Sequence, residues 1–445
     1  AACPSARWRC PRRPSKGCWI KDATAARRAA LHLLAAVRTG ATFGAARDRA
    51  LVGLADRDGR LAYELAAGVL RRQAALDRTL DLSRADPRLH DILRLGTYQL
   101  TALSRVPSYA AVATSVTLAR ETAGDAAARY VNRTLRDLTR ERPTVAERET
   151  HSHPAWLVAR WRARFGAAET ERLVAWNDTR PALILQPVRW DASRLATELR
   201  AAGFGVENAP FAAGLHVTKA AHTPQTLRAP ALPGFAAGAF IVQDAAHALV
   251  CRFANPAPGA VVYDACAAPG GKAVLLAARG ARLIAGEARR ERLTRLTETL
   301  GRAGVAARVV LADLGAAPFA GAAFDAVLVD APCTATGTMA RHPDARWRIT
   351  PDTIPRAAAR QQRLLDAAAA LVRPGGTLVY ATCSLEPEEN GDQVNAFLER
   401  HAHFRRAPVP GAVPAELLTA AGDFESLPQR HGTDGAFAAR LVREQ

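Results

Sequence analysis

Apolar residues recur every three or four positions along residues 22 to 142. The clearest examples are Leu31, Leu34 and Val37, followed by Leu61, Leu65 and Val69. This spacing places an apolar stripe on one face of each helix, so it predicts an all-helical domain. Pro87 and Pro107 fall between the periodic segments, which indicates that the breaks are turns. We assign this domain to residues 22–144.

Residues 145–238 carry a mixed pattern in which short helices and short strands alternate. A helix is predicted for His153 to Phe165. A second helix is predicted for Ser193 to Gly203, where the glycine ends it, and Phe204 to Glu207 reads as a strand. These elements predict a small α/β domain that connects the helical domain to the rest of the chain.

From residue 239 to residue 445 strands and helices alternate regularly. The predicted strands are Val261–Ala265, Arg282–Glu287, Ala307–Ala312, Phe324–Asp330 and Gly376–Thr382. Nearly continuous apolar strands separated by helices predict a parallel sheet covered on both faces, as in a Rossmann-like α/β domain. Ligands of such sheets bind at the carboxyl ends of the strands, so residues at those ends should carry the chemistry.

The composition agrees with this multidomain organisation. The chain has 445 residues, more than one hydrophobic core usually organises, and no apolar run approaches the roughly 20 residues of a membrane helix. We therefore expect a soluble protein with no membrane partner. The formal charge of +18 suits a polyanion such as nucleic acid. Only four of the 60 basic residues are lysine and alanine is abundant, so a general bias toward arginine and a solvated basic surface is the alternative.

The seven cysteines show neither a pairing rhythm nor the C-x-x-C spacing of a metal site. We expect a reduced, cytoplasmic setting and no bound metal. Residues 1–21 contain three of these cysteines, several Arg and Pro residues and no apolar segment of the kind that a secretory signal needs. We interpret them as a disordered extension or a misplaced start, with a transit peptide as the alternative.

The first predicted strand of the last domain runs into the sequence DACAAPGGK, Asp264 to Lys272. Its two glycines allow a tight turn and a close approach of the backbone to a ligand, although such a turn is by itself a weak signal. Glu287 ends the second strand, 17 residues after Gly270 (287 minus 270), and Asp313 follows the third. Carboxylates there could accept hydrogen bonds from the ribose and the adenine of an adenosyl ligand. Otherwise they are helix-capping or solvated acids.

The fourth and fifth strands each deliver a cysteine to the same rim. LVDAPCTATG contains Cys333 and LVYATCSLEPEEN contains Cys383. One cysteine after a strand is usually a small buried hydrophobic residue, whereas two at neighbouring strand ends favour a functional pair. Carbon 5 of cytosine is a poor nucleophile, and addition of a thiolate to carbon 6 turns the ring into an enamine that can take a methyl group. A second group at the same face must then help to remove the carbon-5 proton.

These motifs, together with RHPDARW (Arg341 to Trp347), resemble the bacterial ribosomal RNA cytosine-5 methyltransferases of the RsmB group, also called Sun or Fmu. LAYELAAGVLR, LRLGTYQL, VPSYAAV and YVNRTLR resemble the NusB-like amino-terminal domain of that group. HPAWLV and LPGFAAGAFIVQD resemble its connecting region. The resemblance implies an S-adenosyl-L-methionine-dependent enzyme that forms 5-methylcytosine in 16S ribosomal RNA. We expect it to act as a monomer.

The resemblance also implies roles for the site residues. Cys383 is the attacking nucleophile and Cys333 assists its release. Asp330 lies near both donor and base, and Lys272 either lowers the pKa of the nucleophile or forms an ion pair with Asp330. The residues expected to line the cofactor mainly through backbone groups are Cys266, Ala267, Ala268, Pro269, Gly270 and Gly271. The cofactor-binding set is completed by Lys272, Glu287, Asp313 and Asp330.

Several positions keep a structural alternative. Glu287 stands where the family usually has Asp, and its longer side chain can still reach a ribose diol. His342 and Arg346 either contact RNA phosphates or are exposed and solvated. Trp156 and Trp161 are interpreted as core residues and not as platforms for base stacking.

Three other function classes fit less well. A DNA cytosine-5 methyltransferase would use Cys333 as the attacker and leave Cys383 without a function. An amino-group methyltransferase should carry [DN]-P-P-[FY] where this chain has DAPC. A non-catalytic RNA-binding factor would not be expected to keep both cysteines.

Overall fold

The computed structural model describes residues 16–141, 152–219 and 227–445. The chain divides into two compact units, Ala1–Pro154 and Ala155–Gln445. The expected extension at residues 1–15 and the start of the expected connecting domain at residues 145–151 lie outside the described residues. Residues 16–21, expected to belong to a disordered extension, are helical instead.

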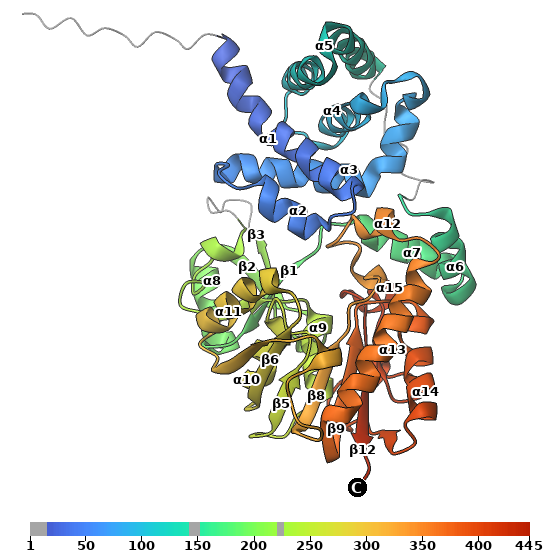
Figure 1. The fold of residues 1–445 in the computed structure, drawn as a ribbon. Coiled ribbons are helices and arrows are strands. Elements are labelled where there is room, and N and C mark those ends of the chain that lie inside the picture. Colours follow the sequence, from blue (N-terminus) through green and yellow to red (C-terminus); the bar gives the residue numbers. More distant parts are fainter. Residues whose placement is uncertain (1–15, 142–151, 220–226) are drawn as a thin grey trace, which may run out of the picture. The chain divides into compact units, whose positions relative to one another are not determined.

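The first unit is built from helices, as predicted. They are α1 (Lys16–Arg38), α2 (Phe43–Ala50), α3 (Asp56–Thr79), α4 (His90–Ala102) and α5 (Ser108–Glu141), with 3-10 turns at Leu82–Arg84 and Pro87–Leu89 (Figure 1). Leu34, Val37, Leu65 and Val69 come from the predicted stripes, and all four are buried in one cluster. The predicted periodicity therefore identified the buried faces of α1 and α3.

Helices α3 and α4 approach each other closely at Gly68. A Cβ atom at Gly68 would lie 2.0 Å from the ring of Tyr98 on α4, so no larger residue fits without displacing that ring. The hydroxyl group of Tyr98 donates a hydrogen bond of 2.8 Å to Glu64 on α3. The small residue and the aromatic ring thus set the spacing of the two helices.

The second unit begins with two helices and a small antiparallel sheet. The two helices are α6 (Ala155–Phe165) and α7 (Ala167–Asp178). A third helix, α8 (Ala192–Ala201), follows the first strand of the sheet. The sheet has the order β2-β3-β1-β4, with β1 (Leu183–Pro187), β2 (Phe204–Asn208), β3 (Leu215–Lys219) and β4 (Phe240–Val242). Leu195 and Leu199 of α8 are buried against this sheet. The predicted small α/β domain is confirmed, but β4 joins its sheet from beyond residue 239, where the next domain was expected to start.

The large sheet contains the five predicted parallel strands. They are β5 (Val261–Asp264), β6 (Arg282–Glu287), β7 (Ala307–Leu311), β8 (Phe324–Asp330) and β9 (Val372–Thr382), in the spatial order β9-β8-β5-β6-β7. Each carboxyl end agrees with the prediction to within one residue. The observed pairings between these five strands are all parallel.

The expectation of a wholly parallel sheet is wrong at one edge. Strand β12 (Ala436–Arg443) runs antiparallel beside β9 and carries β10 (Phe404–Arg406) and β11 (Phe424–Ser426). The chain reaches β12 after passing through α14 (Gly391–Arg400), β10, β11 and α15 (Pro428–His431), and β12 then pairs antiparallel with β9. An antiparallel edge on a parallel sheet is common in large α/β folds.

Alternate residues of each central strand face two different helical layers. Val262 and Leu328 pack with α9 (Ala245–Ala254), α10 (Gly271–Ala278) and α11 (Arg290–Ala303). Tyr263 and Val329, the next residues along, pack with α13 (Thr353–Leu371) and α14 (Gly391–Arg400). This alternation explains the continuous apolar strands, because both faces are covered. The remaining short helices are α12 (Ala345–Arg348) and α15 (Pro428–His431).

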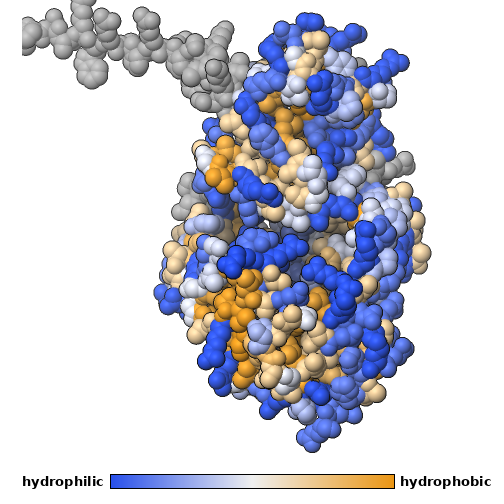
Figure 2. Space-filling view, viewed as in Figure 1, coloured by the Kyte–Doolittle hydropathy of each residue, from blue (hydrophilic) through white to orange (hydrophobic). Residues whose placement is uncertain are grey.

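The visible surface interleaves hydrophilic and apolar residues, as Figure 2 shows. Among the described residues no helix is long and apolar enough to cross a membrane.

We predict that Gly68→Ala destabilises the first unit by about 1–3 kcal/mol, because the added methyl group must displace the Tyr98 ring. Gly59→Ala in the same helix is the control: its Cβ meets nothing within 4 Å, so a gain of about 0.5–1 kcal/mol in helix propensity is expected. Thermal unfolding of the full chain, with hydrogen exchange to assign the transition to α3, measures both. Equal effects of the two substitutions would contradict the packing argument.

Candidate active site

The site is built where the strand order reverses. The chain leaves β5 toward β6 and β7 on one side, and then places β8 and β9 on the other. Asp264 at the end of β5 pairs with Leu328 of β8, so the loops that follow β5 and β8 begin side by side. A crevice at the carboxyl ends of the strands is expected at such a reversal.

The glycine-rich loop after β5 requires its glycines. Gly270 has a φ of +108°, a conformation that side chains other than glycine rarely adopt. A Cβ atom at Gly271, the first residue of α10, would lie 2.6 Å from Oε1 of Gln243. That oxygen is buried and accepts no hydrogen bond from the described residues. The loop thus forms a close backbone cradle with an acceptor beside it.

The two predicted acids occupy the ends of the neighbouring strands. Glu287 is 4% exposed at the end of β6, where Oε1 accepts the backbone N–H of Arg289. Its Oε2 atom lies 3.2 Å from Nη1 of Arg292. Asp313, beyond β7, is exposed and accepts the N–H of Gly315 at 3.0 Å. Asp313 therefore caps a short turn, whereas the burial of Glu287 goes beyond what a capping or solvated acid needs.

An ion pair joins the start of α10, which follows the glycine-rich loop, to the end of β8. Nζ of Lys272 lies 2.7 Å from Oδ2 of Asp330 and 3.3 Å from Nδ1 of His247. Burial is the largest effect and acts to lower the pKa of Lys272, but the charge and the hydrogen bond of Asp330, with Cys251 and Cys383, together outweigh it and the pKa is raised. Burial and the charge of Lys272 together hold the pKa of His247 well below its usual value, so His247 is neutral and can accept a hydrogen bond. Of the two roles considered for Lys272, the ion pair is the contact observed.

The two cysteines meet at the ends of β8 and β9. Their sulfur atoms are 3.2 Å apart, and both thiols are free. The hydrogen bond with Cys383 and burial raise the pKa of Cys333 well above its usual value. Cys333 is therefore a thiol that can donate its proton toward the sulfur of Cys383.

Two other cysteines of the described region lie in or beside the glycine-rich loop, and they are unsuited to act as thiolates. Burial raises the pKa of Cys251 to about 12. The pKa of Cys266 is also raised, by burial first and then by the charge of Asp264.

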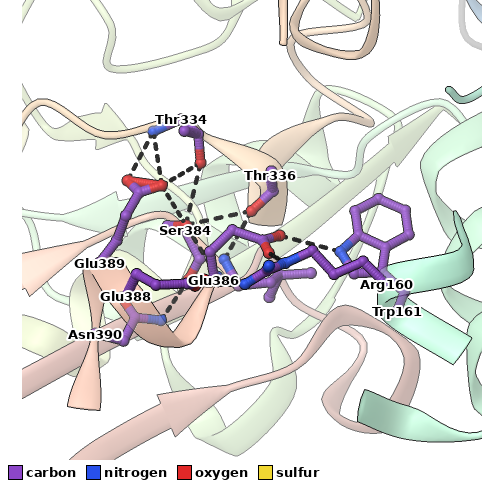
Figure 3. Close-up of polar contacts among 10 residues, drawn as sticks. Arg160, Trp161, Thr334, Thr336, Ser384, Glu386, Glu388, Glu389 and Asn390 are labelled. Carbon is purple, nitrogen blue, oxygen red and sulfur yellow. Dashed lines mark hydrogen bonds and ion pairs between the residues drawn. The ribbon is translucent and has the colours of Figure 1, made fainter. Parts of the chain in front are cut away.

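A polar network between the two cysteine loops was not found from the sequence. Glu389 is fully buried and receives hydrogen bonds from Thr334 and Ser384, the residues that directly follow Cys333 and Cys383 (Figure 3). The available signal was the acidic run that follows Cys383 in the LEPEEN segment. A charged run is usually a solvated surface, so the pattern gave no reason to expect burial.

Two expectations about arginine and tryptophan residues have different outcomes. Arg346 is fully buried and donates to Asp178 at 2.6 Å and to the carbonyl of Asn177 at 2.8 Å. It is therefore neither a solvated residue nor one exposed to RNA phosphates, while His342 is exposed. Trp161 is 1% exposed within an apolar cluster and is a core residue, while Trp156 is partly buried and packs against that cluster.

Three family models match successive parts of this chain. Residues 24–140 match the NusB family, and residues 153–223 match the ferredoxin-like domain of RsmF/B-like methyltransferases. Residues 252–442 match 16S rRNA methyltransferase RsmB/F. These matches and the observed elements confirm the predicted helical, small α/β and Rossmann-like parts.

Known proteins are similar over almost the whole chain. A probable ribosomal RNA small subunit methyltransferase B of Synechocystis is 36% identical over 432 residues, covering 89% of this chain and 94% of the relative. The ribosomal RNA small subunit methyltransferase B of Xylella fastidiosa is 39% identical over 402 residues, covering 87% and 92%. The crystal structure of PH0851 has a TM-score of 0.78 at 24% identity, covers 95% of this chain and 99% of its own, and supports the fold.

A pH dependence of stability follows from Asp264, which is fully buried beneath the glycine-rich loop. Burial, and then the charge of Asp330, raise its pKa from 3.8 to about 7. The folded state therefore binds this proton more tightly than the unfolded state does, and its contribution to stability falls as pH rises from about 4 to 7. At ~1.4 kcal/mol per pKa unit the loss is a few kcal/mol.

We predict that Asp264→Asn flattens this loss, measured by urea unfolding of the cofactor-free chain between pH 4 and 8. Asp392→Asn, at an exposed carboxyl group on α14, should keep the wild-type profile. A variant profile as steep as that of the wild type would rule out Asp264 as its source.

Proposed function

Since the chain belongs to the RsmB family of 16S rRNA methyltransferases, we propose that it methylates carbon 5 of a cytosine in that RNA through a covalent bond to Cys383. The observation that carries the proposal is the pair of free cysteine sulfurs 3.2 Å apart at neighbouring strand ends. A single nucleophile would suffice for addition, whereas a paired thiol also provides a group for release.

S-adenosyl-L-methionine is the methyl donor, and it supplies a methyl group activated on a sulfonium. The residues present fit such a ligand. The backbone of Cys266 to Gly271 forms the cradle, and the buried carboxylate of Glu287 is suited to the ribose hydroxyls. Asp313 would accept from the adenine amino group with the carboxylate that now caps the turn. Asp330 and Lys272 would line the end of this cradle that faces the cytosine base.

The proposed chemistry starts at Cys383. Its sulfur bonds to carbon 6 of the cytosine, and the thiol proton passes to N3, where the Asp330 carboxylate can accept a hydrogen bond from it. The resulting enamine carries electron density at carbon 5, which would take the methyl group while the sulfonium of the donor becomes a neutral thioether. The carbon-5 proton then passes to Cys333, which gives its own proton to the sulfur of Cys383 as the bond between that sulfur and carbon 6 breaks. The electron pair of that bond returns to Cys383, and the N3 proton is released to solvent.

Cys333 assists the last step. The two sulfur atoms are 3.2 Å apart, so the thiol of Cys333 can give a proton to the sulfur of Cys383 as that sulfur departs and take up the proton from carbon 5. Because burial and the hydrogen bond favour the protonated form of Cys333, it does not compete with Cys383 for carbon 6.

The RNA contacts belong to the same proposal. The NusB-like helices of residues 22–144 would hold the folded 16S rRNA largely through its phosphates, while the catalytic domain of residues 239–445 takes in a flipped-out cytosine. We propose that the protein acts as a monomer in the cytoplasm.

We predict different failures for the two cysteines. Cys383→Ala should be inactive and form no covalent adduct, whereas Cys333→Ala should accumulate a protein–RNA complex because release stalls. Labelled methyl donor on small-subunit RNA, followed by denaturing gels, measures both outcomes. Cys251→Ala, which removes a buried thiol outside the pair, should stay within a few-fold of the wild type. An adduct trapped by Cys383→Ala would reverse the roles.

We predict that Glu287→Gln weakens binding of S-adenosyl-L-methionine about 5- to 30-fold, the equivalent of ~1–2 kcal/mol for one charge-assisted hydrogen bond. Isothermal titration calorimetry without RNA measures this affinity. Glu291→Gln, an exposed position in the first turn of α11, is the control and should bind like the wild type. Unchanged affinity in Glu287→Gln would remove the ribose role.

A further inference from the structure

We propose that Glu389 is a positioning residue whose carboxylate ties together the loops after β8 and β9 and thereby sets the spacing of the two cysteine sulfurs. The inference rests on the proposed function, since it gives Glu389 its effect through Cys333 and Cys383. Glu389 touches neither sulfur in the contacts described, and it acts through the residue that follows each cysteine.

The carboxylate binds the loop of Cys333 through two groups of one residue. Oε2 accepts the backbone N–H of Thr334 at 2.9 Å, and Oε1 accepts the hydroxyl group of the same residue. Both the direction of the backbone and the rotamer of Thr334 are thereby fixed. Because Thr334 is bonded directly to Cys333, the orientation of the Cys333 backbone is constrained as well.

The same carboxylate binds the loop of Cys383. Its Oε1 atom accepts the hydroxyl group of Ser384 at 2.9 Å. The carbonyl group of Cys383 in turn accepts the N–H of Gly337, which lies four residues after Cys333. The two loops are therefore linked through Glu389, as the close-up in Figure 3 shows, and through the backbone. Direct contacts of Thr334 and Thr336 with Ser384, and of Thr336 with the backbone of Leu385, add to these links.

A third element anchors the carboxylate itself. Nε2 of Gln361 on α13 donates to Oε2 of Glu389 at 3.0 Å and to the carbonyl of Pro332 at 3.1 Å. Pro332 precedes Cys333, so the residues on both sides of this cysteine are held by the Glu389 and Gln361 pair. The backbone of Glu389 is held too, because its carbonyl accepts the hydroxyl of Tyr380 at 2.6 Å.

The charge of Glu389 supports the same role. Glu389 is fully buried, and in the contacts described its carboxylate is held by neutral donors. Burial raises its pKa, while the bonds from Thr334, Gln361 and Ser384 act in the opposite direction. A negative charge here also contributes to the raised pKa of Cys333, after the hydrogen bond to Cys383 and burial. Position and charge both favour Cys333 as the proton donor.

The neighbouring Glu388 provides a matched control. Its side chain is 42% exposed, and its carboxylate pairs with Arg160 and not with either cysteine loop (Figure 3). Glu388→Gln and Glu389→Gln therefore remove the same charge from adjacent residues, and only the second removes it from the network.

The experiment measures the spacing of the sulfurs directly. Diamide oxidises a thiol pair to a disulfide and takes up the two hydrogen atoms, at a rate that depends on how well the sulfurs are held together. We expect Glu389→Gln to slow formation of the Cys333–Cys383 disulfide at least fivefold, as followed by peptide mass spectrometry. Its turnover number should fall about 10- to 100-fold while the KM for S-adenosyl-L-methionine stays within threefold. Glu388→Gln should match the wild type in all three measurements.

The outcomes separate this inference from the proposed function. If Glu389→Gln loses turnover but forms the disulfide at the wild-type rate, or if neither changes, the positioning role is wrong. If Cys383→Ala is active while Glu389→Gln still slows the disulfide, the proposed function fails and the spacing role stands. Should Glu389→Gln not fold, Ser384→Ala removes one of the same hydrogen bonds, and it must slow the disulfide for the inference to hold.

Discussion

The site depends on one constraint, the parallel pairing of β5 with β8. The chain runs outward from β5 through β6 and β7 before it returns to place β8 against the free side of β5. This pairing sets the glycine-rich loop beside the end of β8, where Lys272 and Asp330 form their 2.7 Å ion pair. Because a buried charge without its partner costs several kcal/mol, the pair holds only while the two strands stay in register. The ion pair thereby joins the part of the site proposed to bind the methyl donor to the part that carries the two cysteines.

The two parts of the site use carboxylates in different ways. Asp330 is paired with a cation, so its position is fixed by a strong charge interaction that depends little on direction. Glu389 is held by neutral donors, whose hydrogen bonds fix direction more strictly and leave its negative charge in place beside Cys333. A cation in that position would favour a thiolate at Cys333 and give the site two competing nucleophiles. Neutral donors therefore suit a site that must keep one of its two cysteines protonated.

The sequence predicted the parts of the fold and site that follow from local periodicity. The carboxyl ends of the strands were correct to within one residue because continuous apolar runs end where the loops begin, and these ends determine where Cys333 and Cys383 lie. The antiparallel β12 was missed because its direction is set by a long return path and not by its own residues. Arg346 and Glu389 were misjudged or missed for a shared reason: a charged side chain is buried only when distant residues supply its partners, and no local pattern records them.

The misjudged arginine also changes what the net charge of +18 means for RNA binding. Arg346 is fully buried against Asp178, and Arg341 bridges two aspartates of the loops around it. In the helical unit Arg94 is likewise engaged, by two carboxylates. These guanidinium groups are engaged by carboxylates within the protein and hold loops and helices in place. Because the salt dependence of RNA binding reflects the number of phosphates contacted and not the formal charge, only exposed arginines contribute to it. The net charge is therefore weaker evidence for RNA than the two cysteines are for the chemistry.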